Sequence, residues 1–265
     1  MKKVLIFVPL LVFLFFASAF ALPFNPRPVT EADGAQLIYN GSGELKLGGT
    51  GGIFDTIGAT SYAADPVNTQ SSAAVFTNDA SGGSVASFII AIAGNAGSNT
   101  VGIYSPNTLQ LVPIFSGAIN ANAPIQATVS FLSGGEVKVT QTVGTSGIIN
   151  NSVPGFGNIF GFYLAGAGGT FYSEDDKNQD GNPQVLAYQG NGADFLTLPG
   201  FASGAFSQNE WIFAFEDLPW ASTDRDFNDL VINVESIRAV PEPAVMLLLG
   251  FGLIGVAGIR RKIQK

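Results

Sequence analysis

Residues 216–229, a stretch that we call the acidic corner, are rich in side chains that carry oxygen, and Asp224, Asp226 and Asn228 stand at alternate positions. Its carboxylates and its asparagine are Glu216, Asp217, Asp224, Asp226, Asn228 and Asp229. Calcium is a hard cation that takes about six to eight oxygen ligands, and a tight loop can turn alternate side chains toward one centre. Carboxylates that are buried together repel, so the loop needs a compensating cation. The pattern predicts calcium here, with Glu216 ligating directly or through water.

A second interpretation of the acidic corner needs no metal. Carboxylates can accept hydrogen bonds from backbone N–H groups, and Arg225 is placed in the sequence to form ion pairs with them. The corner would then be a hydrogen-bonded structural element. Asp226→Ala distinguishes the two interpretations, because an equal drop in melting temperature with calcium and with chelator would favour the hydrogen-bonded corner.

A first acidic segment, residues 174–181, carries a related pattern. Asp176, Asn178 and Asp180 alternate and Gly181 follows, as in the first half of a calcium loop. The twelfth position of an EF-hand loop is Ala187 here instead of Glu, so the segment is not an EF-hand. Two interpretations stay open: a calcium loop within a β protein, or a solvated turn rich in Asp, Asn and Gly.

The composition restricts what the protein can bind. Between residues 22 and 239 there are 19 acids and 6 bases, a net charge of −13, which suits divalent cations and predicts no binding to nucleic acid. Cysteine is absent, so disulfides do not hold this part of the chain. Histidine is also absent, which removes many catalytic and zinc sites. About 220 residues suffice for one large β domain or two small ones.

The elements that must position these acids are short apolar runs separated by Gly, Asn, Ser and Pro. Their composition and spacing predict strands at residues 84–93, 100–104, 109–115, 126–132, 136–143, 159–164, 185–189, 211–215 and 230–237. Many short strands without crossover helices are typical of a mostly β fold, a β-sandwich or jelly-roll-like domain, which we assign to residues 84–239.

Two finer expectations concern the packing of this domain. Valines at period two place Val137, Val139 and Val143 on one buried face, with Lys138, Thr140 and Thr142 exposed. Residues 22–83 alternate less clearly and are expected to be an N-terminal lead-in, loosely ordered or with extra strands such as residues 35–39 and 44–47.

The aromatic residues near the acids suggest an alternative function. Trp211, Trp220, Tyr172 and Tyr188 are able to stack on sugars, as in a carbohydrate-binding or adhesive module, although Trp211 in its apolar strand is also a core candidate. Two carboxylates also act as acid and base in many glycoside hydrolases. Carboxylates that converge on one point favour a metal, whereas a facing pair across an aromatic cleft favours sugar chemistry.

The first 21 residues have the order of a secretory signal peptide. Lys2 and Lys3 precede an apolar run, and the small residues Ala19 and Ala21 predict cleavage by signal peptidase after Ala21. An uncleaved membrane anchor is the alternative.

The C-terminal residues 240–265 contain Pro241, Glu242 and Pro243, then 16 apolar or glycine residues, then a basic cluster. A helix of that length spans roughly 24 Å, short for a bilayer core of about 30 Å, and basic residues can snorkel to make up part of the difference. Cations on the outer flank of both hydrophobic segments place both termini in the cytoplasm and the domain outside. A buried core helix would not end in such a cluster.

This tail resembles the PEP-CTERM sorting signal, which is recognised by exosortase, a membrane-embedded processing enzyme of Gram-negative bacteria. The resemblance implies a transient anchor in the inner membrane, processing near residues 241–243, and delivery to the cell surface or extracellular polysaccharide matrix.

A second resemblance lies in residues 211–217 and 224–231, which are similar to the signature of the domain of unknown function 4114. Residues 160–164 and 171–173 are similar to the strands that precede it, and members are exported bacterial proteins without an assigned activity. We therefore expect a non-enzymatic surface or matrix protein, stabilised by calcium, with extracellular polysaccharide as a further candidate partner.

Overall fold

The computed structural model describes residues 26–29, 36–37, 45–80, 84–92, 98–116, 125–143, 148–179, 181–198 and 200–241. Asn25–Pro241 form one compact unit. The predicted signal peptide with Ala19 and Ala21, the metal candidate Asp180, and the sorting residues Glu242 and Pro243 with the apolar tail lie outside the described residues. Among the described helices, none has the length and apolar character needed to cross a membrane.

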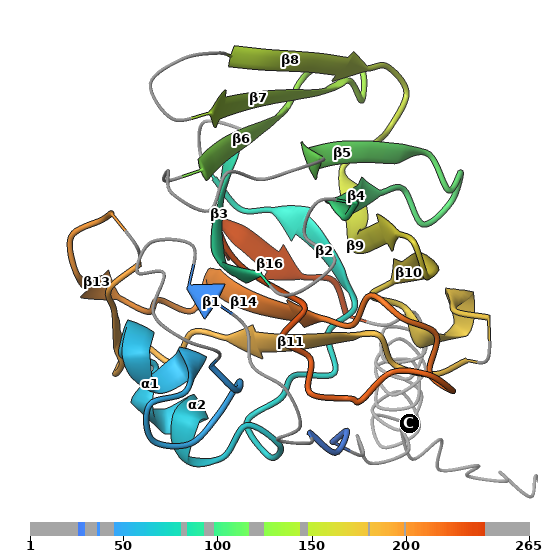
Figure 1. The fold of residues 1–265 in the computed structure, drawn as a ribbon. Helices are drawn as coiled ribbons and strands as arrows, with labels where there is room; N and C mark the ends of the chain where they lie inside the picture. Colours follow the sequence, from blue (N-terminus) through green and yellow to red (C-terminus); the bar gives the residue numbers. More distant parts are fainter. Residues whose placement is uncertain are drawn as a thin grey trace, which may run out of the picture. The chain divides into compact units, whose positions relative to one another are not determined.

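The first sheet contains the strands that flank the acidic corner. Its antiparallel strands follow the order β11-β14-β15-β3-β6-β7-β8, and β1 pairs with β3 (Figure 1). Their bounds are β1 (Gln36–Leu37), β3 (Ser84–Ile92), β6 (Ile125–Phe131), β7 (Val137–Val143), β8 (Ile148–Val153), β11 (Val185–Gln189), β14 (Glu210–Phe215) and β15 (Leu230–Glu235). β14 and β15 are consecutive in the sequence and pair with each other, so the loop between them connects the two strands at one end.

The second sheet is also antiparallel and has the order β16-β2-β9-β4-β5, with β10 beside β9. These strands are β2 (Val75–Asn78), β4 (Thr100–Tyr104), β5 (Leu111–Ser116), β9 (Ile159–Gly166), β10 (Gly169–Tyr172) and β16 (Ile237–Ala239). A small hairpin, β12 (Phe195–Leu196) and β13 (Gly204–Ala205), and the helices α1 (Ile53–Ile57), α2 (Thr60–Ala64) and η1 (Asp175–Lys177) complete the described elements.

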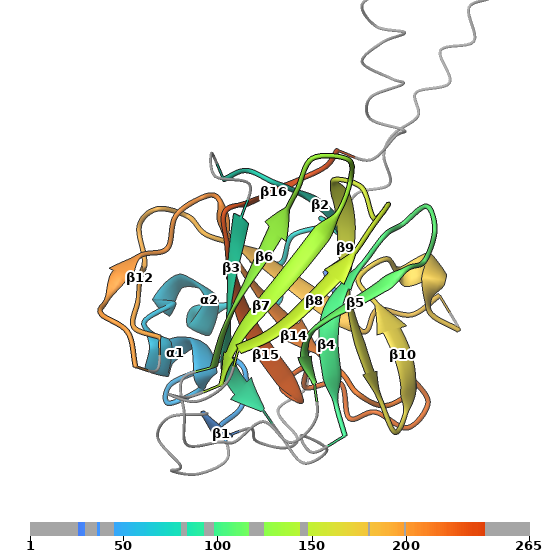
Figure 2. The ribbon, with the colours of Figure 1, turned by 90° about the horizontal axis from the view of Figure 1, so that it is seen from above.

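Two hydrophobic cores lie on opposite faces of the first sheet. The first core fills the space between the two sheets, where Phe76 and Phe162 meet Trp211 and Phe213. The second core lies on the other face, where α1, α2 and the β12–β13 segment cover Ile212 and neighbouring residues (Figure 2). Because β14 is covered on both faces, all of its residues are buried, which explains its continuous apolar run.

The mostly β character and the predicted strands are confirmed, with shifts of a few residues at their ends. Val137 and Val139 are buried and Lys138 is exposed, as predicted, while Thr140 is half-buried. The side chains of Thr142 and Val143 lie outside the described residues.

Residues 45–80 differ most from the expectation of a loosely ordered lead-in. β1, within the predicted strand 35–39, and β2 are extra strands, whereas in the predicted strand 44–47 Leu45 forms a single β-bridge. The two helices were not predicted, because five residues are too short to show helical periodicity. α1 buries Ile53, Phe54 and Ile57 and ends at Gly58, whose φ of 89° suits glycine.

Candidate metal centre

The acidic corner connects the buried ends of β14 and β15. Phe215 and Leu230 pair across the two strands, so the residues that follow β14 and those that precede β15 lie at the same end of this strand pair. The loop thereby brings together residues that are separated by up to 13 positions in the sequence. A cation held between Glu216 and the far side of the loop would clamp the two strands, as the sequence predicts.

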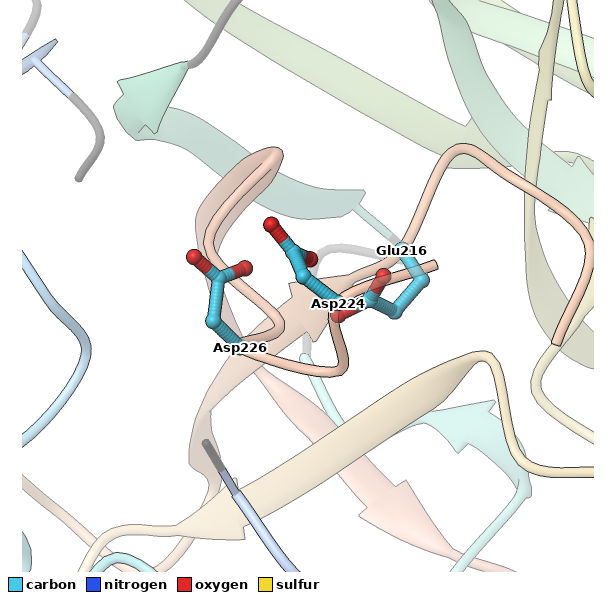
Figure 3. Close-up of side chains that lie close together, drawn as sticks. All are labelled: Glu216, Asp224 and Asp226. Carbon is cyan, nitrogen blue, oxygen red and sulfur yellow. The ribbon is translucent and has the colours of Figure 1, made fainter. Parts of the chain in front are cut away.

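Three carboxylates of the acidic corner converge on one point. Glu216, Asp224 and Asp226 each place one oxygen within 4.8 Å of the others, and Figure 3 shows the three side chains gathered at the loop. Glu216 is 0% exposed and Asp226 1%, whereas Asp224 is exposed. The group therefore has one buried side and one side that meets solvent.

Glu216 is the most constrained member of the group. Its Oε1 accepts a hydrogen bond of 2.6 Å from the Phe227 N–H, while its buried Oε2 has no hydrogen-bond partner. Burial, opposed by that hydrogen bond and assisted by the charges of Asp229, Asp226 and Asp224, raises the pKa of Glu216 to about 9. A buried acceptor oxygen without a partner is costly, and a metal ion would satisfy it.

Arg225 does not neutralise these carboxylates, although it lies between Asp224 and Asp226 in the sequence. Its backbone is left-handed, with φ of 68°, and its guanidinium lies 4.4 Å from the centre of the Trp220 ring. The Arg225 Nε is buried without a hydrogen-bond partner, and none of the ion pairs among the described residues involves Arg225. This arrangement argues against the interpretation in which Arg225 balances the charge of the corner.

The other three predicted ligands lie next to the converging group and form hydrogen bonds of their own. Asn228 donates from its backbone N to Asp226 Oδ1 at 3.3 Å and from Nδ2 to Oδ2 at 2.7 Å. It therefore orients Asp226. The predicted set of six thus divides into three converging carboxylates and three neighbours.

Asp217 and Asp229 form the other side of the corner. Asp217 Oδ2 accepts a hydrogen bond of 2.8 Å from Asn99 Nδ2, and Asp229 Oδ2 accepts one of 2.9 Å from the Asp217 N–H. Burial and then the charge of Asp217 raise the pKa of Asp229 to about 7. No pattern in the sequence indicates Asn99, which precedes β4 and lies 118 positions from Asp217.

The first acidic segment is balanced by cations and hydrogen bonds of the protein. Asp175 pairs with Arg27 at 2.5 Å, and Glu174 pairs with Lys177 at 3.1 Å and accepts a hydrogen bond from Tyr104. The Asn178 side chain is occupied by the backbone of residues 172 and 182, and Asp176 is exposed. Among the described residues, this segment does not gather its carboxylates at one point.

Most of the candidate sugar-stacking aromatic residues are inaccessible. Trp211 and Tyr188 are 0% exposed in the first and second cores. Trp220 is half-buried against the second core with Arg225 over its ring, and Tyr172 is half-buried against Tyr104. These rings do not form an open stacking surface beside the carboxylates.

Two regions of the chain match models of known families. Residues 146–237 match the model of the Domain of unknown function (DUF4114), and residues 239–262 match that of the PEP-CTERM protein-sorting motif. Both resemblances inferred from the sequence are confirmed. The chain matches none of the curated proteins or solved structures with which it was compared.

The sorting motif places the chain in the class of exported proteins that exosortase processes. Within that class, this chain carries a DUF4114 region, which contains the whole acidic corner. One residue separates this region from the start of the sorting motif. The DUF4114 match brings no assigned activity, so the function of the corner has to be argued from its geometry.

Proposed function

We propose that this chain is a non-enzymatic cell-surface or extracellular-matrix protein whose β domain is stabilised by calcium bound to Glu216, Asp224 and Asp226. The observation that carries the proposal is the buried Glu216 Oε2, which lacks a hydrogen-bond partner and lies near two further carboxylates. Desolvated carboxylates repel unless a cation compensates them. Calcium supplies that charge and accepts oxygen ligands in a flexible geometry.

The burial of the three residues suits an ion that enters from solvent. Glu216 and Asp226 form the inner side of the site, and the exposed Asp224 forms its outer side. Water would complete the coordination there, because three side chains do not supply about six to eight oxygens unless all bind through both oxygens. Calcium that binds only the folded state stabilises it by mass action.

The geometry supports a metal over carbohydrate chemistry. Three carboxylates converge instead of two facing each other across an aromatic cleft, and Trp211 and Tyr188 are buried. The absence of histidine and cysteine from the sequence also removes the commonest nucleophiles and bases. We therefore assign the corner a structural function. Extracellular polysaccharide stays a candidate partner because the proposed sorting route delivers the protein to the cell surface or matrix.

A calorimetric calcium titration of the exported protein tests the metal assignment. We expect one ion per chain, and we expect Asp226→Ala to abolish the binding heat because one inner carboxylate is lost. Asp176→Ala is the matched control, since it removes an exposed carboxylate of the first acidic segment. Binding that is lost in Asp176→Ala and kept in Asp226→Ala would place the ion at the first acidic segment and contradict the assignment to the acidic corner.

The processing route is proposed from the two chain ends. Signal peptidase would cleave after Ala21, the apolar tail would anchor the chain in the inner membrane, and exosortase would then cleave near residues 241–243 before surface delivery. Intact-mass measurement of surface-extracted protein tests this, with an expected chain from Leu22 to between Pro241 and Pro243. A full tail on extracellular protein would contradict the sorting proposal.

A further inference from the structure

The loop that carries the candidate metal ligands also inserts a large side chain into a hydrophobic core. Phe227 lies between Asp226 and Asn228, is 0% exposed, and belongs to the second core. Its N–H donates to Glu216 Oε1, and its backbone is left-handed with φ of 55°. One residue therefore contacts the buried ligand through its backbone and the second core through its side chain.

The outer layer of the second core includes α1 and α2, which have no strand pairing with either sheet. They are held by side-chain packing, by a hydrogen bond from the Thr197 N–H to the Ile57 carbonyl, and by hydrogen bonds from Thr60 and Ser61 to Asp194. Phe54 packs edge-on against Tyr188 at 4.8 Å, and Tyr62 against Phe206 at 5.4 Å. A layer that no ladder of strand hydrogen bonds joins to the sheets opens more easily than the central strands of a sheet.

The hydrophobic side chains of the acidic corner pack on the second core. Of residues 216–229, Phe227 is a buried member of the second core and Trp220 packs against it. Among the described residues, none of that range belongs to the first core, whose members Phe215 and Leu230 flank the corner. Movement of the ligand loop at Phe227 therefore acts on the second core.

We propose that cation binding at Glu216, Asp224 and Asp226 is coupled through Phe227 to the packing of α1 and α2 on the second core. This inference rests on the proposed function, since it requires that a divalent cation binds there. Without the cation the three carboxylates repel, and this repulsion acts on the loop at Phe227, whose N–H donates to Glu216 Oε1. The ion holds the loop closed and thereby keeps the Phe227 ring inserted in the second core.

Coupling of this kind is reciprocal. If calcium tightens the second core, then loosening the second core at a distance weakens calcium binding by the same factor. Ile57 is suited to this test because it is 1% exposed in the second core, lies on α1, and is 159 positions before Glu216. Ile114 of β5 is the matched control, 2% exposed in the first core.

The experiment is a calcium titration of the exported wild-type protein and of two single variants. We expect Ile57→Ala to weaken calcium binding by about fivefold or more, the lower range of typical coupling between sites. Ile114→Ala removes the same atoms from the other core and should change the affinity by less than about twofold, because distant sites without shared contacts act independently. Equal effects of the two variants, or unchanged affinity in Ile57→Ala, would overturn the coupling.

Two further results keep the test decisive. If Ile57→Ala does not fold, Ile57→Val creates a smaller cavity and should weaken binding in the same direction. Hydrogen exchange of the wild type should show faster exchange at residues 53–64 when calcium is chelated, with β5 unchanged. Uniform or absent changes would contradict the coupling, whereas a wild type that binds no calcium would refute the proposed function instead.

Discussion

The first acidic segment and the acidic corner share a sequence pattern but differ in how their charges are balanced. In the first acidic segment, Arg27 and Lys177 pair with Asp175 and Glu174. In the acidic corner, the Arg225 guanidinium lies over the Trp220 ring, and the described ion pairs do not include Glu216. Each segment has one buried carboxylate oxygen without a hydrogen-bond partner, Asp175 Oδ1 and Glu216 Oε2, but Asp175 has the Arg27 cation beside it. Alternation of Asp and Asn therefore does not define a metal site. A buried carboxylate without a pairing cation is the better indication.

Burial explains why the difference matters. Asp176 in the first acidic segment is exposed, and solvent screens an exposed charge at little cost. Glu216 and Asp226 are buried, where repulsion is screened less. The two segments should therefore respond differently to calcium, pH and substitution.

The largest effect is expected from Glu216→Gln. At calcium about 100-fold above its dissociation constant, the ion contributes about 2.7 kcal/mol of stability, which this variant should lose. In chelator at pH 8, below the raised pKa of Glu216, the wild-type carboxyl is mostly protonated, so the neutral amide should leave the stability nearly unchanged. Denaturant unfolding in both conditions measures this, with Asp176→Asn as a control that should change neither value.

The pH dependence of the metal-free protein gives the next contrast. The pKa of Glu216 is raised to about 9 and that of Asp229 to about 7, so between about pH 5 and 9 the folded state retains protons that the unfolded state has released. Stability in chelator should therefore fall as pH rises through this window.

Glu210 and Glu235, whose pKa values burial also raises, act in the same direction. Urea unfolding at pH 5, 7 and 9 in chelator checks the slope, and Glu216→Gln should flatten it. A stability that increases over this range would mean that the corner carboxylates are already compensated without metal.

Asn228→Ala should have a smaller effect, since it removes the amide that orients Asp226 without removing a converging carboxylate. Loss of a residue that orients a metal ligand typically weakens metal affinity by about tenfold or more. Calcium titration measures the change. An affinity within twofold of the wild type would show that Asp226 is held by other contacts.

The smallest effect is expected in the first acidic segment. Arg27→Ala breaks the pair with the partly buried Asp175 and should cost about 1 kcal/mol, equally with calcium and with chelator. Lys138→Ala, at an exposed site on β7, is the control for loss of a positive charge. A cost that appears only in calcium would show that the first acidic segment binds the ion.

The strands were predictable because each is a short run with local β preference. The residues of β4 and β11 were predicted at both ends, and Trp211 was correctly expected in the core. The helices α1 and α2 escaped prediction because each is a single short turn whose stability comes from packing on the second core.

The candidate site was predictable in place but not in detail. Alternation identified the residues of the acidic corner, whereas the division between converging and supporting side chains depends on backbone angles at Arg225 and Phe227. The hydrogen bond from Asn99 depends on pairing between distant strands. Charge balance in the first acidic segment depends on Arg27, which lies 148 positions from Asp175.

The most direct test of calcium stabilisation is a set of four melting curves, for the wild type and Asp226→Ala, each in calcium and in chelator. We predict a melting temperature of the wild type several degrees higher in calcium, roughly 2–4 °C per kcal/mol for a domain of this size. Asp226→Ala should melt at nearly the same temperature in both conditions. A wild type whose melting temperature is the same in calcium and in chelator would contradict the account.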